Sequence, residues 1–339
     1  MAFSMSPKEN YLACLNHKPH EYTPGMPDMG MAGMFLPFER GEGGAGTDVF
    51  GVRWVAPYSG GLGAALPAPG EFLLTDITKW KEVVQMPYDA LKNFDWEAGA
   101  AAELAFINRD TTSVDVSVLN SIYERLASLM GFEEALLAMI TEPEATYELL
   151  SALTDWKIEM IKYLAKYFKP DTYAHFDDVA TERMLFMSPQ TYRDMIKPLH
   201  TKIAHACIDE GIIPIQHTCG KADVIVQDMI DEGHAGWNAV QSTNDIEDII
   251  EKHGDEFVII GGYNSNAGPG LPTATEAEVR AEVRRCMDTY GKYGKGYIFM
   301  GFVLTAFDPD APPANDMFGS PLNGFIVDEF LKIRAEQAK

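Results

Sequence analysis

Cysteine, positive charge and long apolar runs are all scarce in this sequence. The four cysteines, Cys14, Cys207, Cys219 and Cys286, are too few and too dispersed for a disulfide framework, so we expect reduced thiols or a metal ligand. The apolar runs are too short to cross a bilayer, and the first twenty residues lack the basic and apolar regions of a secretory signal. These absences predict a cytoplasmic protein without a membrane span.

The charge balance also excludes classes of partner. Against 50 acidic residues there are only 27 lysines and arginines, which gives a formal net charge of −23. A surface of this sign repels nucleic acids and anionic membranes, and it disfavours a highly anionic substrate unless a local basic pocket receives it. At 46% hydrophobic and 23% charged residues, the chain can still bury a substantial core.

The remaining pattern is that of alternating strands and helices. Helical patterns cover 132–168, 189–210, 222–232 and 276–293, and they lie between short apolar segments of strand character. The strand segments are 112–119, 171–178, 211–220, 235–242, 257–264 and 296–303. Such alternation predicts parallel βα units, which either close a barrel or build an open sheet, and the number of repeats favours an α/β barrel of the TIM type. We expect one domain over 1–339, with 1–80 as an N-terminal arm and 81–339 supplying most βα units.

The N-terminal arm has two contrasting parts. Residues 6–16 predict a short helix, with a serine cap, a proline in the first turn and an early glutamate. Residues 17–46 are rich in Gly, Pro and Met, which favours an irregular surface loop. The alternative is a pocket lined by the adaptable side chains of this segment. Its candidates are Met26, Met29, Met31, Met34 and Phe35.

A barrel carries its functional groups at the carboxyl ends of its strands and in the loops that follow them. By that rule the polar residues ending the predicted strands converge on one mouth. They are Asp177 and Asp178, His217 and Cys219, Gln241 and Ser242, and Tyr263 and Asn264.

The segment "IIPIQHTCGKAD" contains the most specific pattern. Alternate strand residues point the same way, so His217 and Cys219 face one side with Cα atoms roughly 6.6 Å apart. Imidazole and thiolate are favoured zinc ligands, and a catalytic zinc site has three protein ligands and one open position. The alternative is a buried cysteine beside a hydrogen-bonded histidine at a strand end.

Longer motifs carry a family resemblance over nearly the whole chain. "FDDVATERMLFMSPQTYRDMIKPLHTKI", "QHTCGKA" and the strand end "GGYN" occur in the order seen in the uroporphyrinogen decarboxylase superfamily. The chain resembles in particular its corrinoid-dependent methyltransferase branch. The resemblance implies a (β/α)8 barrel with its chemistry at the mouth, and a zinc ion held by the histidine and cysteine of the HxCG motif.

Two departures from the family pattern narrow this interpretation. The decarboxylases grip the substrate carboxylates with an arginine-rich N-terminal segment, whereas the matching stretch here has only Arg40, so decarboxylation is disfavoured. The methyltransferases carry a third zinc ligand, a cysteine, where this chain has residues 300–302. Three explanations are open: a carboxylate such as Glu182 or Asp178 completes the site, Cys286 moves in, or the metal is weakly held or absent. We favour a carboxylate, and we expect Cys286 to be a buried thiol.

A zinc site with fewer thiolates is a stronger Lewis acid, suited to a departing alkoxide or phenolate. Within the activities that the resemblance implies, this favours an O-demethylase component, which moves a methyl group from a methoxylated substrate, with an aromatic one favoured, to a separate corrinoid protein. Asp178, or else Asp177, would act as proton donor beside His217. The predicted substrate-binding residues are Met26, Met29, Met34, Tyr263 and Asn264.

Other activities stay open at this point. The barrel could instead pass a methyl group from the corrinoid protein to a thiol such as coenzyme M. A non-catalytic barrel that binds a tetrapyrrole or corrinoid is a further alternative. Self-association into a homo-oligomer is equally open.

Overall fold

The computed structural model describes residues 3–34, 36–40, 46–56, 65–305 and 319–338. Their main feature is a seven-stranded parallel sheet with the order β1-β5-β6-β7-β8-β9-β10. The strands are β1 (Met29–Ala32), β5 (Ser113–Val118), β6 (Thr172–Phe176), β7 (Ile213–His217), β8 (Gly236–Val240), β9 (Val258–Gly262) and β10 (Tyr297–Met300).

The sheet curls until its two edges meet. Gly25 forms an isolated parallel bridge with Phe299, and the Phe299 N–H donates to the carbonyl of Pro24 at 2.8 Å. The segment that leads into β1 therefore lies beside β10. This closure confirms the predicted TIM-barrel fold, with seven assigned strands in the described part of the chain rather than eight.

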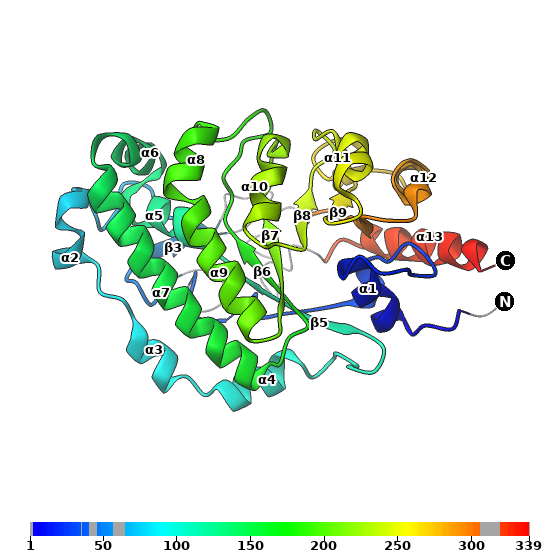
Figure 1. Cartoon of the computed structure of the whole chain (residues 1–339), viewed down its shortest axis with the longest axis horizontal. Helices are drawn as coiled ribbons and strands as arrows, with labels where there is room; N and C mark the ends of the chain where they lie inside the picture. The colour runs from blue at the N-terminus through cyan, green and yellow to red at the C-terminus, as the bar shows by residue number, and fades with distance from the viewer. Residues whose placement is uncertain (1–2, 35, 41–45, 57–64, 306–318, 339) are drawn as a thin grey trace.

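Helices cover the outside of the curled sheet, as α7, α9 and α10 do in front of the strands in Figure 1. The longer ones are α1 (Pro7–Leu15), α4 (Trp96–Glu103), α5 (Ile122–Met130), α6 (Phe132–Thr141), α7 (Pro143–Tyr167), α9 (Lys197–Asp209), α11 (Ile246–His253), α12 (Glu276–Thr289) and α13 (Leu322–Gln337). The shorter ones are α2 (Trp80–Val83), α3 (Tyr88–Asn93), α8 (Pro189–Met195) and α10 (Val226–Asp231). In the described ranges, no helix has the length and apolar character needed to cross a bilayer.

The six strands predicted from 112 onward are all present, but two predicted helices are each divided. The pattern over 132–168 is α6 followed by α7, which begins at Pro143, and the pattern over 189–210 is α8 followed by α9. Proline lacks the N–H that a helix interior requires, and it fits the first turn. Prolines at the start of α7 and α9 therefore begin new helices.

The expectation of an irregular loop over 17–46 is wrong for β1, which is the first strand of the barrel. A Cβ added to Gly30 would lie 2.5 Å from the carbonyl oxygen of Ser113, so only glycine lets β1 approach β5 at this register. Glycine suggested a loop in the sequence, whereas here it permits close strand packing. The predicted helix before it is confirmed as α1, with Ser6 forming a capping box with Glu9.

A buried ionic network fastens the N-terminal segment to the barrel. Arg125 of α5 pairs with Glu39 at 2.6 Å and with Asp48, and Lys157 of α7 also pairs with Glu39. All four side chains are at most 3% exposed. A small antiparallel sheet follows, made of β2 (Gly46–Thr47), β3 (Arg53–Val55) and β4 (Leu66–Pro67). These contacts hold the segment over the barrel beside α5 and α7.

Candidate metal centre and cavity

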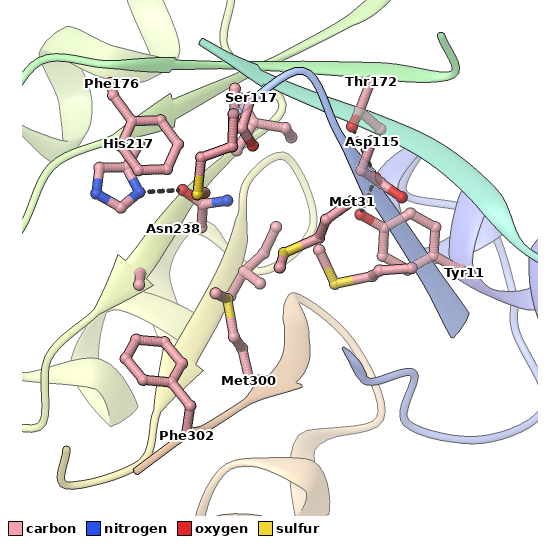
Figure 2. Close-up of a pocket in the computed structure, with 16 residues that line it drawn as sticks. Tyr11, Met31, Asp115, Ser117, Thr172, Phe176, His217, Asn238, Met300 and Phe302 are labelled. Carbon is pink, nitrogen blue, oxygen red and sulfur yellow. Dashed lines mark hydrogen bonds between the residues drawn. The ribbon is translucent and has the colours of Figure 1, made fainter. Parts of the chain in front are cut away.

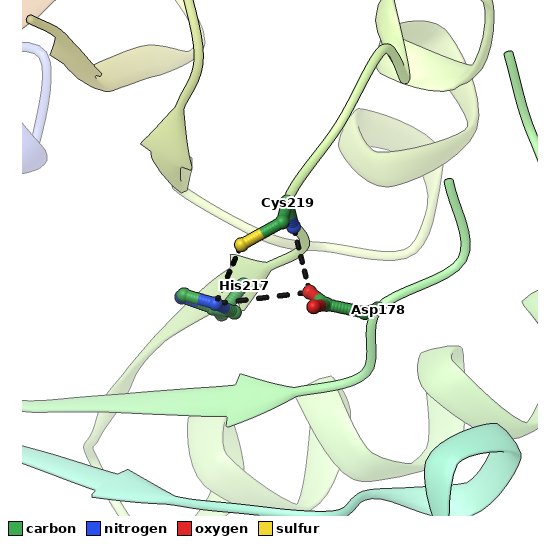
Figure 3. Close-up of side chains that lie close together, drawn as sticks. All are labelled: Asp178, His217 and Cys219. Atoms are coloured by element: carbon green, nitrogen blue, oxygen red, sulfur yellow. Dashed lines mark hydrogen bonds and ion pairs between the residues drawn. The ribbon is translucent and has the colours of Figure 1, made fainter. Parts of the chain in front are cut away.

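Three potential metal ligands meet at the carboxyl ends of β6 and β7. Asp178, His217 and Cys219 place one ligand atom each within 4.8 Å of the others (Figure 3). The parallel register pairs Phe176 with His217, so the residue two positions beyond β6 reaches the end of β7. Strand pairing therefore brings the aspartate to the HxC motif.

The spacing of these atoms suits a tetrahedral ion. The Nε2 atom of His217 lies 3.8 Å from Oδ1 of Asp178 and 3.8 Å from Sγ of Cys219. In a tetrahedral zinc site with bonds of about 2.0–2.3 Å, donor atoms lie roughly 3.4–3.6 Å apart. Both distances from His217 are therefore within a few tenths of an ångström of the tetrahedral spacing, and the ligand atoms of Asp178 and Cys219 lie within 4.8 Å of each other.

The ring of His217 is oriented for ligation by its neighbours. Its Nδ1 lies 2.8 Å from the amide oxygen of Asn238, which can only accept, so the proton is on Nδ1 and the Nε2 lone pair faces the cluster. The ring of Phe176 stacks on one face of the imidazole with a centroid distance of 3.5 Å. The second-sphere partner and the stacked ring fix both tautomer and orientation.

The residues around Cys219 explain the rest of the motif. Gly220 has φ +86°, and a Cβ there would lie 2.7 Å from the carbonyl oxygen of Ala180. The Thr218 hydroxyl accepts from the Val179 N–H at 3.0 Å, and the Cys219 N–H donates to Oδ1 of Asp178 at 2.6 Å. The HTCG sequence thus builds a tight turn that holds the thiol beside the carboxylate.

Burial sets the protonation state of two of the ligands. It lowers the pKa of His217, which keeps the imidazole neutral and able to ligate. Burial, followed by the nearby Asp178 charge, raises the pKa of the Cys219 thiol well above its usual range. Cation binding at this cluster would therefore release a proton from Cys219.

Asp177, predicted as an alternative catalytic group, serves a structural role instead. Its carboxylate accepts the N–H groups of Tyr123 and Glu124 at the start of α5, at 3.1 and 2.9 Å, and it lies 2.8 Å from Nε2 of His200. The side chain is fully buried and turned away from the cluster. Successive residues leaving a strand point to opposite sides, so only Asp178 reaches the mouth.

Glu182 does not complete the predicted metal site. It lies in the exposed turn between the bridge partners Ala180 and Leu185, whereas Asp178 occupies the third position of the cluster. Cys286 is buried within α12, as expected, with its sulfur beside Arg285 and Glu282.

A cavity of about 60 Å³ lies inside the barrel, and His217 is the cluster residue that lines it (Figure 2). We call the end near His217, at the carboxyl end of β7, the upper end (left in Figure 2), and the end near Tyr11 of α1 the lower end (right in Figure 2). Its wall is mainly apolar, with a set of methionine and phenylalanine side chains. These are Met29, Met31, Met34, Met300, Phe176 and Phe302.

The predicted substrate residues therefore divide into two groups. Met29 and Met34 line the cavity, whereas Met26 begins a 3-10 turn outside it. The Tyr263 hydroxyl donates to the carbonyl of Pro269 at 2.9 Å, the backbone N–H of Asn264 donates to Glu282 of α12, and neither residue is in the cavity lining. Phe35 lies outside the described residues.

Sequence reasoning missed Asn238, although the strand register pairs it directly with His217. It also missed Glu124 at the start of α5, whose pKa is raised well above its usual range by burial and then by the charge of Asp178. Arg40, which interacts electrostatically with both Glu124 and His217, also donates to the side-chain oxygen of Asn120 at 3.2 Å. These side chains add charged and polar neighbours to the cluster.

The fold and the site together place this protein among α/β barrels that carry a cluster of potential metal ligands at the mouth. Residues 117–306 match the family model described as Uroporphyrinogen decarboxylase (URO-D), which is more than half of the sequence. The chain belongs to the uroporphyrinogen decarboxylase family. No curated protein matches the sequence significantly.

Two solved structures resemble this chain to different degrees. A methyltransferase from Methanosarcina mazei superimposes with a TM-score of 0.70 at 14% identity, over 99% of this chain and 100% of that chain. D-Psicose 3-epimerase from Clostridium cellulolyticum H10 matches with a TM-score of 0.40 at 11% identity, over 74% and 86%. The first comparison establishes a shared fold over the full length of both chains.

Proposed function

We propose that this protein is a corrinoid-dependent methyltransferase, acting as the component that removes a methyl group from an oxygen. The observation that carries the proposal is the His217, Cys219 and Asp178 cluster at the rim of a methionine-lined cavity. The fold shared with a methyltransferase supports it. A reduced corrinoid on a separate protein would be the methyl acceptor and would supply the electron pair that receives the methyl group.

Family membership does not make the protein a porphyrinogen decarboxylase. That substrate carries many carboxylates, which need several cations to receive them. No lysine or arginine lines the described cavity, and Arg40 is engaged by Asn120 while its guanidinium lies 5.3 Å from the Trp54 ring centroid. The apolar wall favours a small, weakly charged substrate.

The donor set favours an ether over a thiol. One thiolate, one imidazole and one carboxylate would hold a zinc ion with a fourth position open. Such an ion supplies Lewis acidity, which stabilises an alkoxide or phenolate as the carbon–oxygen bond breaks. The electron pair of that bond would stay on oxygen, and the corrinoid acceptor would supply the pair for the new bond to the methyl carbon.

The chain's own residues have defined tasks in this reaction. Asn238 and Phe176 hold the His217 ring in place, and the methionine side chains exclude water around the methyl group. Glu124 lies close enough to Asp178 to interact with it electrostatically, and its raised pKa suits it to deliver the proton that converts the alkoxide to an alcohol, while Asp178 serves as the carboxylate ligand.

The cavity volume refines the substrate class. A pocket that holds a benzene ring measures about 150 Å³, whereas this cavity measures about 60 Å³. It accepts the methoxy end of a substrate or a small aliphatic methyl ether. An aromatic substrate would keep its ring above the cavity or displace the flexible methionines.

A second candidate function is methyl transfer to a thiol, favoured by the presence of Cys219 in the cluster. Metal analysis and product identification together separate the candidates. We expect about one zinc per chain, lost in His217→Ala and in Cys219→Ala, and an alcohol product from a methyl ether. A thioether product would establish the second candidate, and a folded wild-type protein that does not bind added zinc would contradict both zinc-dependent mechanisms.

A further inference from the structure

The lower end of the barrel cavity combines three polar side chains that the methyl-transfer chemistry does not use. They are Tyr11 from α1, Asp115 from β5 and Thr172 from β6, and we name them the cavity floor (Figure 2). The cavity connects this floor with His217 at the upper end. A ligand that presents its methyl group at the mouth would place its other end here.

Asp115 has an unusual environment for a buried acid. It is 4% exposed, and it lacks an ion pair with any lysine, arginine or histidine in the described ranges. Burial raises its pKa, which reflects the cost of an isolated charge in a low-dielectric interior. A bound cation would provide the missing countercharge.

Once their mutual hydrogen bonds are formed, the side chains of the cavity floor can accept further hydrogen bonds but have no proton left to donate. Tyr11 and Thr172 donate their hydroxyl protons to Oδ1 of Asp115 at 2.8 and 2.7 Å. The Ser113 hydroxyl and the Gly30 N–H donate to the other carboxylate oxygen of Asp115, Oδ2. A hydroxyl has one proton, so the remaining capacity of Tyr11 and Thr172 is lone pairs alone. The floor therefore repels carboxylates and suits a group that only donates.

Ser117 is a further polar residue in the lining of the cavity, in addition to the three of the cavity floor. Ser117 lies two residues after Asp115 on the same face of β5 and is 6% exposed. Its hydroxyl lines the cavity without a hydrogen-bond partner among the residues that the structure describes. Buried hydroxyls ordinarily find a partner, so this one is available to a ligand.

We propose that the cavity floor is a binding subsite for the ammonium end of a small aliphatic amine. The three N–H groups of an ammonium would donate to the lone pairs of Tyr11, Thr172 and Ser117, and its charge would balance Asp115. Combined with the proposed function, on which this extension rests, the substrate is a short molecule with a transferable methyl group at one end and an ammonium at the other.

The test measures binding of three ligands of nearly equal size to protein stripped of metal. Propylammonium, 1-propanol and propionate differ in charge at one end, and calorimetry gives their affinities without any methyl transfer. We expect propylammonium to bind at least tenfold more tightly than 1-propanol, and propionate to show no binding. Equal affinities for the ammonium and the alcohol would overturn the subsite and leave the proposed methyl transfer unaffected.

Two charge-matched variants locate the effect. Asp115→Asn should abolish the preference for propylammonium, whereas Asp171→Asn should keep it. Asp171 pairs with Lys8 at 2.8 Å outside the cavity lining. A preference that survives in Asp115→Asn would contradict the proposal.

A third variant covers the case in which Asp115→Asn does not fold. Ala174→Val narrows the cavity wall without changing charge and should remove binding of propylammonium and of the alcohol. Undiminished propylammonium binding in Ala174→Val would place the cation elsewhere and overturn the assignment.

Discussion

The hydrogen bond between His217 and Asn238 makes a quantitative prediction for metal affinity. Both residues are 7% exposed, and the Nδ1 to Oδ1 distance is 2.8 Å, so water cannot readily replace the amide oxygen. Asn238→Ala frees the imidazole to rotate and to move its proton to Nε2. Loss of such a second-sphere partner weakens metal binding by about 10–100-fold, or roughly 1.4–2.7 kcal/mol.

The assay is competition for zinc with a chromophoric chelator at fixed pH. Asn10→Ala provides the matched control, because Asn10 is also a buried asparagine but binds Tyr22 and Glu21 far from the cluster. The control should keep the wild-type zinc affinity even if it lowers stability. An Asn238→Ala protein that binds zinc as tightly as wild type would refute the assigned tautomer and the ligand role of Nε2.

Three further predictions concern stability, each measured by chemical denaturation. Gly220→Ala should lower the free energy of unfolding by more than about 1 kcal/mol, because its φ is +86° and the added Cβ meets Ala180; an unchanged midpoint would contradict this turn geometry. Arg125→Met should cost about 3–5 kcal/mol, because Asp48 and Glu39 lose their shared buried partner, and a neutral effect would mean that the network is dispensable. His175 is fully buried, neither ring nitrogen has a hydrogen-bond partner among the described residues, and burial lowers its pKa well below 6.5. Below pH 6.5 His175 binds a proton in the unfolded chain but stays neutral in the folded chain. The free energy of unfolding therefore falls by about 1.4 kcal/mol for each pH unit that the pH is lowered. His175→Leu should flatten the pH dependence between pH 6 and 5 by about that slope, and an identical slope would refute a neutral His175.

The barrel strands were predictable because the short apolar runs and the turn residues that flank them indicate the same elements. Each of the six segments from β5 to β10 is a short apolar run ended by a polar or turn residue, and β5 to β9 are buried almost throughout. β1 was missed because Gly30 signals a turn locally, while its purpose is to admit the Ser113 carbonyl across the strand pair. That contact depends on tertiary structure.

The candidate site was predictable only in part, for a related reason. His217 and Cys219 share a strand, so spacing alone places them together. The choice of Asp178 over Asp177 and Glu182 depends on how the chain leaves β6, and local pattern does not encode that path. The cavity floor joins α1 to β5 and β6, with Tyr11 and Asp115 more than a hundred positions apart in sequence. No sequence period links such residues.

Formation of methylcobalamin tests the central claim most directly. Zinc-loaded protein is mixed with chemically reduced cob(I)alamin and a set of small methyl ethers, and the absorbance of methylcob(III)alamin is followed. Our account predicts methylation well above the protein-free rate, together with release of the alcohol, and loss of both in Cys219→Ala. Methylation no faster than without protein, with the corrinoid reduced, the zinc site filled and ethers both with and without an ammonium end supplied, would contradict it.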